Sequence, residues 1–281
     1  MTDYQQNEDS ESSEDESDSS KKTRVDDSTQ VQPYRGLWLL SSVGKVKSVG
    51  SVEHLGSAGR FEDGNPAVAI VANKLGTGYW IIYANGFIEP SGTAIGFEGT
   101  QSLDSAITSA VCTSDHGILL ALANGSVKAL GTAEFLGSAL DLNLDNPIVN
   151  IALSKNGYWL LSQSGRVINC GDTQFLGSAT EAVVEHNSNA VSIAAHPAGD
   201  GYWIALSDGF VVTYGRSIFY GRVEDPVSPI VSVIATHDGN GYWLIDATGN
   251  VFPFGEIANF DTFLEDNNQI EGTIVSATPV S

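Results

Sequence analysis

Apolar residues recur along this chain in short runs that are separated by glycine-containing turns. One unit consists of the apolar run 147–153, the strand-like stretches GYWLLSQSG and RVINCG, and the short segment 174–177. Runs of this length bounded by Gly, Asn and Asp predict β-strands. Pairs such as Asn124-Gly125 and Asp208-Gly209 favour hairpin turns, because glycine accepts a positive φ without a Cβ clash. Each unit therefore predicts four short antiparallel strands.

The unit occurs six times. Its second strand starts at glycines that are separated by 42, 39, 40, 44 and 40 residues: Gly36, Gly78, Gly117, Gly157, Gly201 and Gly241. A second glycine follows eight residues later in every copy and a third follows six after that, and all 5 tryptophans lie two residues past the first glycine. About forty residues with four antiparallel strands is the spacing of a propeller blade. The fold class that we predict is all-β, a six-bladed β-propeller of four-stranded blades.

The two ends of the repeat region complement each other. The first copy lacks a leading apolar run, because residues 23–32 are polar, whereas the last copy is followed by an extra apolar run at 273–278. We expect the C-terminal strand to join the first blade and close the propeller, which removes two exposed sheet edges. The propeller then spans residues 31–281.

Residues 1–30 have a different composition. They contain ten acidic and three basic residues, many serines and almost no aliphatic side chains. Such a segment cannot bury enough apolar surface to offset its ordering entropy, so we expect a disordered acidic tail. It is either a solubilising arm or a docking arm for a basic partner.

The pattern GYWLLSQSGRVINCGDTQFLGSA resembles the Gly-Tyr-Trp repeats of bacterial β-propeller proteins. The resemblance covers residues 36–281, although the third copy has Ile118 and Leu119 in place of the aromatic pair. It implies a recognition or scaffold module, with no catalytic motif to carry over.

The strands expected at the centre of the propeller carry no charged side chain. These are residues 67–72, 106–113, 147–154, 190–195, 229–236 and 273–278, and none of them is Asp, Glu, Lys or Arg. A hydrolase working in the channel needs acids, bases or calcium ligands there, so we predict no catalytic residue. We interpret the Tyr-Trp pairs as packing between blades, because adjacent strand residues point to opposite faces.

Acidic residues gather in the loops that lead from each fourth strand to the next first strand. We call this set the acidic rim and expect it to bind a basic surface or cations: Glu62, Asp63, Asp104, Asp141, Asp145, Glu181, Glu185, Glu224, Asp225, Glu265, Asp266 and Glu271. The alternative is that these acids are ordinary solvated loop residues with no binding role. The stretch 141–146 alternates oxygen-bearing residues but lacks the glycine and terminal glutamate of an EF-hand loop, so we predict no metal site. His116, His196 and His237 are interpreted as surface residues.

The net charge of −21 disfavours nucleic acid as a partner. No signal peptide or membrane-spanning segment is predicted, which favours a cytoplasmic protein or one borne on a particle. The function that we predict is a non-catalytic, cofactor-free scaffold that binds protein partners through its loops and acidic tail, as part of a larger surface or virion assembly. A carbohydrate-binding propeller and a hydrolase or lyase with a site in the rim loops are the alternatives.

Overall fold

Strands dominate the part of the chain that the structure describes. The structure is a computed structural model, and the residues it describes are 35–58, 64–97, 103–257 and 270–280. They form six antiparallel sheets of three strands each. The predictions of an all-β fold and of six repeated sheets are therefore confirmed.

Each sheet is numbered by its order along the chain, and its strands are given from the innermost outward. Sheet 1 contains β18 (Ile274–Val280), β1 (Gly36–Ser41) and β2 (Val46–Gly50), and sheet 2 contains β3 (Ala67–Ala72), β4 (Gly78–Tyr83) and β5 (Ile88–Gly92). Sheet 3 contains β6 (Ile107–Ser114), β7 (Gly117–Leu122) and β8 (Val127–Gly131), and sheet 4 contains β9 (Ile148–Leu153), β10 (Gly157–Ser162) and β11 (Val167–Gly171). Sheet 5 contains β12 (Ala190–Ala195), β13 (Gly201–Leu206) and β14 (Val211–Gly215), and sheet 6 contains β15 (Ile230–Ala235), β16 (Gly241–Asp246) and β17 (Val251–Gly255).

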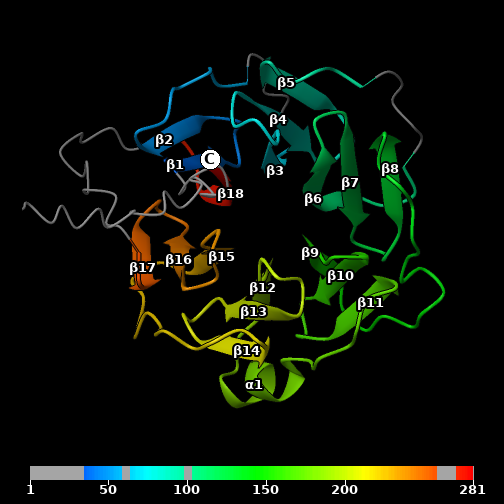
Figure 1. Ribbon diagram of the computed structural model, residues 1–281, viewed down its shortest axis with the longest axis vertical. Coiled ribbons are helices and arrows are strands. Elements are labelled where there is room, and N and C mark those ends of the chain that lie inside the picture. The colour runs from blue at the N-terminus through cyan, green and yellow to red at the C-terminus, as the bar shows by residue number, and fades with distance from the viewer. Residues whose placement is uncertain (1–34, 59–63, 98–102, 258–269, 281) are drawn as a thin grey trace, which may run out of the picture. The chain divides into compact units, whose positions relative to one another are not determined.

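The sheets follow one another around a common centre, with the first strand of each sheet innermost (Figure 1). Neighbouring inner strands are joined by side chains: Asn150 on β9 donates from Nδ2 to Ser109 Oγ on β6 and accepts from Ile193 N on β12. At the chain ends, Ile70 N on β3 donates to Ser276 Oγ on β18. β18 also pairs antiparallel with β1, so the C-terminal strand lies in the first sheet.

The middle strand of every sheet is buried along its whole length. The tryptophans and tyrosines of these strands lie between adjacent sheets, as in the edge contact of Trp159 with Tyr202, whose ring centroids are 4.9 Å apart. Both rings are buried. The interpretation of the Tyr-Trp pairs as packing residues is confirmed, since buried rings present no platform to a sugar.

The residues after each third strand differ from the prediction. We call residues 51–58, 93–97, 132–139, 172–179 and 216–223 the outer segments of sheets 1 to 5. The sequence predicts a fourth strand there, but the described residues contain none. Hydrogen bonds that involve side chains take the place of backbone pairing with a fourth strand. In sheet 4, Trp159 Nε1 donates to Gln174 O at 3.0 Å, and Val167 N donates to Ser178 Oγ at 3.0 Å. Side-chain hydrogen bonds therefore hold the outer segment of sheet 4 in place.

A short helix occupies a place where the sequence predicted a loop. Helix α1 (Thr180–Glu185) follows the outer segment of sheet 4 and carries two residues of the acidic rim, Glu181 and Glu185. Its first turn is closed by a bond from Val183 N to Ala179 O. Six residues are too few for a hydrophobic period to be visible, which explains why the pattern did not reveal it.

Two sequence predictions fall outside the described residues. The tail at 1–30 is one of them, and four acids of the rim (Glu62, Asp63, Glu265 and Asp266) are the other. Within the described ranges, no helix is long and apolar enough to cross a membrane.

Candidate functional site

The acidic rim is built by the way each outer segment returns to the next inner strand. In sheets 1, 3 and 4 the end of the outer segment bonds to the turn between the second and third strands of the same sheet, as Ala139 N does to Gly125 O and Ala179 N to Gly165 O, both at 2.8 Å. The chain then crosses to the next sheet along this edge. The predicted acids of these connections are therefore found at one edge of the sheets.

All eight described acids of the rim are exposed. They are Asp104, Asp141, Asp145, Glu181, Glu185, Glu224, Asp225 and Glu271. Asp104 also accepts hydrogen bonds from Asn124 Nδ2 and Ser126 Oγ, both at 3.2 Å. Its own backbone N–H and the Asn124 amide hold the pKa of Asp104 below its ordinary value. The described part of the rim therefore presents exposed carboxyl groups to solvent.

Two arginines also lie at this edge. Arg222 lies 3.5 Å from Glu224 and 5.4 Å from the centre of the Phe210 ring. Arg166, which directly follows a turn glycine, donates to Asn143 O at 3.4 Å. Sequence reasoning missed Arg166 because it considered the connections between sheets and not the hairpin turns beside them.

A histidine that the sequence did not single out is also found at this edge. His186, directly after α1, places Nδ1 2.7 Å from Asp208 Oδ2 and stacks on Phe210 with centroids 4.0 Å apart. Ser188 Oγ lies 2.9 Å from Ser207 Oγ and accepts from Asp208 N. The contacts of Ser188 and Ser207 are typical of a turn and not of a catalytic nucleophile. Together with the His186–Asp208 contact, they hold the connection after α1 against sheet 5.

The opposite edge carries the three histidines that were predicted to be at the surface. His196 departs from this prediction, because its ring is largely buried, stacks on Trp203 and lies close to Gly239 of sheet 6. Its Nδ1 accepts from Ala198 N at 3.1 Å, and burial lowers its pKa. Among the described residues, no group of three His, Cys, Asp or Glu side chains is arranged to hold a metal ion.

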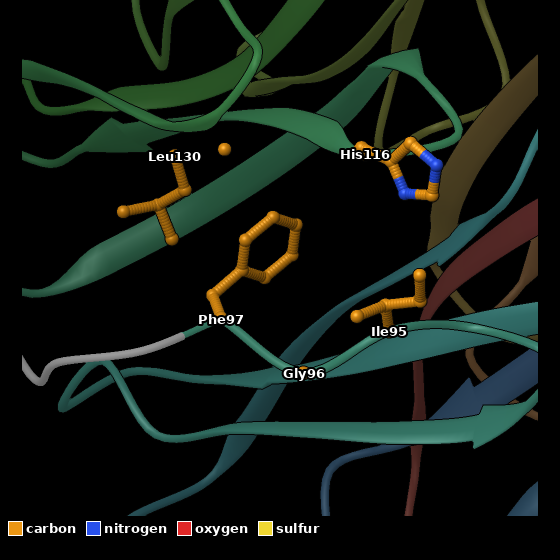
Figure 2. A pocket seen from close by; sticks show the side chains of 6 residues that line it. Ile95, Gly96, Phe97, His116 and Leu130 are labelled. Carbon is orange, nitrogen blue, oxygen red and sulfur yellow. The ribbon is translucent and has the colours of Figure 1, made fainter.

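A pocket of about 320 Å³ lies between sheets 2 and 3 on this opposite edge. It is lined by the outer segment of sheet 2 (Ile95, Gly96 and Phe97), by His116 before β7 and by Leu130 and Gly131 at the end of β8. Figure 2 shows the Phe97 ring between Leu130 on one side and His116 with Ile95 on the other. Apolar walls and a single imidazole offer shape and apolar contact, which suits binding more than catalysis.

The pocket coincides with the copy that lacks the aromatic pair. Ile118 pairs with Leu130 across β7 and β8, in the register where Tyr158 pairs with Cys170 in sheet 4. Isoleucine is shorter than tyrosine and has no hydroxyl. Ile118 is itself buried, but its strand partner Leu130 lines the pocket, which the sequence did not predict.

Comparison with known proteins identifies no relative by sequence. No family model matches the chain, and no curated protein matches it either. Among solved structures, the chain is similar to the β-propeller domain of Cps50 (Swd1) from Myceliophteria thermophila, with a TM-score of 0.49 and 12% identity over 73% of this chain and 69% of that one.

Proposed function

We propose that residues 31–281 form a closed six-bladed β-propeller that acts as a non-catalytic interaction module. Each blade consists of three paired strands and an outer segment, and the pairing of β18 with β1 supports closure of the ring. The described residues of the inner strands carry no charge, which favours a scaffold over an enzyme working at the centre. The repeat belongs, on this proposal, with the Gly-Tyr-Trp propellers that it resembles.

The observation that carries the proposed binding mode is the row of eight exposed acids at one edge of the sheets. A field of one sign along a rim steers an oppositely charged surface and speeds its association. The partner that fits is a protein with a basic surface, and the acidic tail adds charge of the same sign. A place in a larger surface or virion assembly is consistent with such a scaffold.

The test is recovery of partners from native extract with the full chain as bait. Replacing three rim acids (Asp141, Asp145 and Asp225) with Asn removes charge while keeping side-chain size. The matched control replaces exposed acids away from the rim (Glu134, Asp172 and Glu256) with the corresponding amides. We expect a stoichiometric basic protein that binds the wild type and the control, is released by salt and is lost from the rim variant.

Two outcomes would contradict the proposal. Equal recovery by the rim variant and the wild type would exclude the acidic rim as the binding surface. Recovery of a partner whose binding does not respond to salt would exclude charge as the basis of recognition, because exposed charge pairs are screened within about 10 Å at 0.1 M salt. A chain that starts at residue 32 separates the contribution of the tail from that of the rim.

A further inference from the structure

Exposed apolar side chains are concentrated on three successive sheets. The described residues include eleven large apolar side chains that are exposed, and eight of these lie between residues 135 and 227. They are Phe135, Leu140, Leu142, Phe175, Val184, Ile218, Phe219 and Val227. These residues follow β8, β11 and β14, the outermost strands of sheets 3, 4 and 5 (Figure 1). Contiguous exposed apolar patches mark interaction sites on proteins, and these eight side chains are candidates for such a site.

The three phenylalanines share one register. Phe135, Phe175 and Phe219 each lie four residues after the glycine that ends the third strand, and they are 54%, 53% and 50% exposed. The same position is His54 in sheet 1 and Gly96 in sheet 2. An aromatic side chain here is therefore not required by the blade, which forms in sheets 1 and 2 without one.

The core does not account for these rings either. The residue that follows each phenylalanine faces inward instead, because Leu136, Leu176 and Tyr220 pack against the buried apolar clusters. The phenylalanines themselves are exposed, so their rings point away from these clusters. About half of the surface of each phenylalanine residue is exposed to water, and covering this apolar surface with a partner is favourable.

Acidic residues accompany the phenylalanines on all three sheets. Each ring is followed, five to ten residues later, by two exposed acids of the rim: Asp141 and Asp145, Glu181 and Glu185, and Glu224 and Asp225. Apolar side chains at the centre of an interface with charges around them are the usual anatomy of protein recognition. A second copy of this chain, with its own net charge of −21, is repelled by such a surface.

We propose that Phe135, Phe175 and Phe219, with the acids beside them, form one docking surface for a basic partner segment that carries apolar anchor side chains. We call it the phenylalanine surface. The partner's aliphatic or aromatic side chains cover the rings, and its Lys or Arg side chains lie over the carboxylates. The proposal rests on the proposed function for the sign of the partner's charge, and it adds the apolar contacts and their place on sheets 3 to 5.

The experiment measures binding of two synthetic peptides to the full chain by fluorescence anisotropy. One peptide alternates Leu and Lys and the other alternates Ser and Lys, so that only the first offers apolar anchors. The test variant replaces Phe135, Phe175 and Phe219 with Ser. The control variant replaces the two exposed apolar residues that lie elsewhere and do not line the pocket (Leu75 and Phe87) with Ser. Circular dichroism and thermal unfolding check that both variants keep the wild-type fold.

We expect the wild type and the control variant to bind the Leu-Lys peptide more tightly than the Ser-Lys peptide. The phenylalanine variant should lose about tenfold in affinity for the Leu-Lys peptide, as expected when buried aromatic anchors are removed, and should keep its affinity for the Ser-Lys peptide. Three further variants that each restore one phenylalanine should regain part of the loss.

Distinct outcomes overturn the inference and the proposed function. Unchanged binding of the Leu-Lys peptide by the phenylalanine variant, or an equal loss in the control variant, overturns the phenylalanine surface. Failure of the wild type to bind either peptide overturns the basic partner and with it the proposed function. Sedimentation that shows a wild-type dimer, lost in the phenylalanine variant, assigns the surface to a second copy and also overturns the inference.

Discussion

Sheets 4 and 5 are joined differently from sheets 2 and 3. The difference lies in the residue of the middle strand that faces the outer segment of the preceding sheet. In the first junction, Tyr202 of sheet 5 is fully buried and donates its hydroxyl to Gly177 O in the outer segment of sheet 4 at 2.6 Å. In the second junction, Ile118 stands at the equivalent position and the pocket beside Phe97 is found there. The aromatic pair thus has two separate tasks: tryptophan fixes the outer segment of its own sheet, and tyrosine fixes that of the preceding sheet.

Tyrosine and glycine occur together at these junctions. Hydroxyl donation to a glycine carbonyl is found from Tyr79 to Gly56, from Tyr158 to Gly137, from Tyr202 to Gly177 and from Tyr242 to Gly221. Each of these glycines lies six residues after the end of a third strand and has a positive φ. In the two junctions whose middle strand has Leu37 or Ile118 instead of tyrosine, the corresponding residues are Asp261 and Glu98. A glycine at this position therefore goes with the tyrosine that donates to its carbonyl.

We expect the largest effect on stability when the isoleucine of sheet 3 replaces the tyrosine at the equivalent position of sheet 5. Tyr202→Ile removes a buried ring, its edge contact with Trp159 and its hydrogen bond to Gly177 O. We expect the free energy of unfolding to fall by about 3 kcal/mol, as for other large core truncations. Urea denaturation measures it, and Ile118→Leu, a volume-conserving control, should cost under about 1.5 kcal/mol. Similar losses for the two variants would mean that the junctions do not differ.

A smaller loss is expected from a methyl group on the accepting glycine. Gly177 has a φ of +149°, and a Cβ there would meet the Tyr214 ring at 2.0 Å. We expect Gly177→Ala to cost about 2 kcal/mol, from backbone strain and displacement of the ring. Gly96→Ala, in the junction without tyrosine, places Cβ no closer than 3.9 Å to Pro90 and should be nearly neutral. Thermal unfolding of the two variants side by side tests the contrast, and equal melting temperatures would refute it.

The tyrosine junctions should also make the protein sensitive to alkali. Burial raises the pKa of Tyr79, Tyr158 and Tyr202 from about 10 to about 12. A folded pKa above the unfolded value gives a contribution to stability that is complete below pH 10 and is lost as pH rises towards 12. At pH 11 each tyrosine should cost about 1 kcal/mol. Denaturation midpoints between pH 8 and pH 11 measure the slope, and Tyr202→Phe, which cannot ionise there, should make it shallower.

The smallest effect is expected from restoring the aromatic ring in sheet 3. Ile118→Tyr adds volume beside Leu130, which pairs with Ile118 and lines the pocket of about 320 Å³, so we expect the ring to find more space than a close-packed core offers. We expect stability to change by less than about 1 kcal/mol, well below the usual cost of overpacking. Unfolding measurements check this value. A loss of several kcal/mol would mean that Phe97 and Leu130 already fill the junction as tightly as tyrosine does elsewhere.

The distribution of functional residues was only partly visible in the sequence. The acids of the rim could be located because the repeat fixes which loop each one occupies, and the eight described ones are exposed. His186 and Arg166 were missed, since their contacts with Asp208 and Asn143 join residues more than twenty positions apart. The phenylalanine register was present in the repeat, but an apolar side chain in a strand-like segment gives no sign of whether it faces the core or solvent.

The sequence by itself determined the number of sheets, their strand order and the burial of the Tyr-Trp strands. A repeat of about forty residues carries the same turn glycines and the same alternation into every copy, and these local signals are enough. Tertiary structure alone decided that the outer segments are not paired strands, that tyrosine hydroxyls join one sheet to the preceding one, and that three phenylalanines remain outside. Those features depend on contacts between separate copies, and a pattern read along one copy does not contain them.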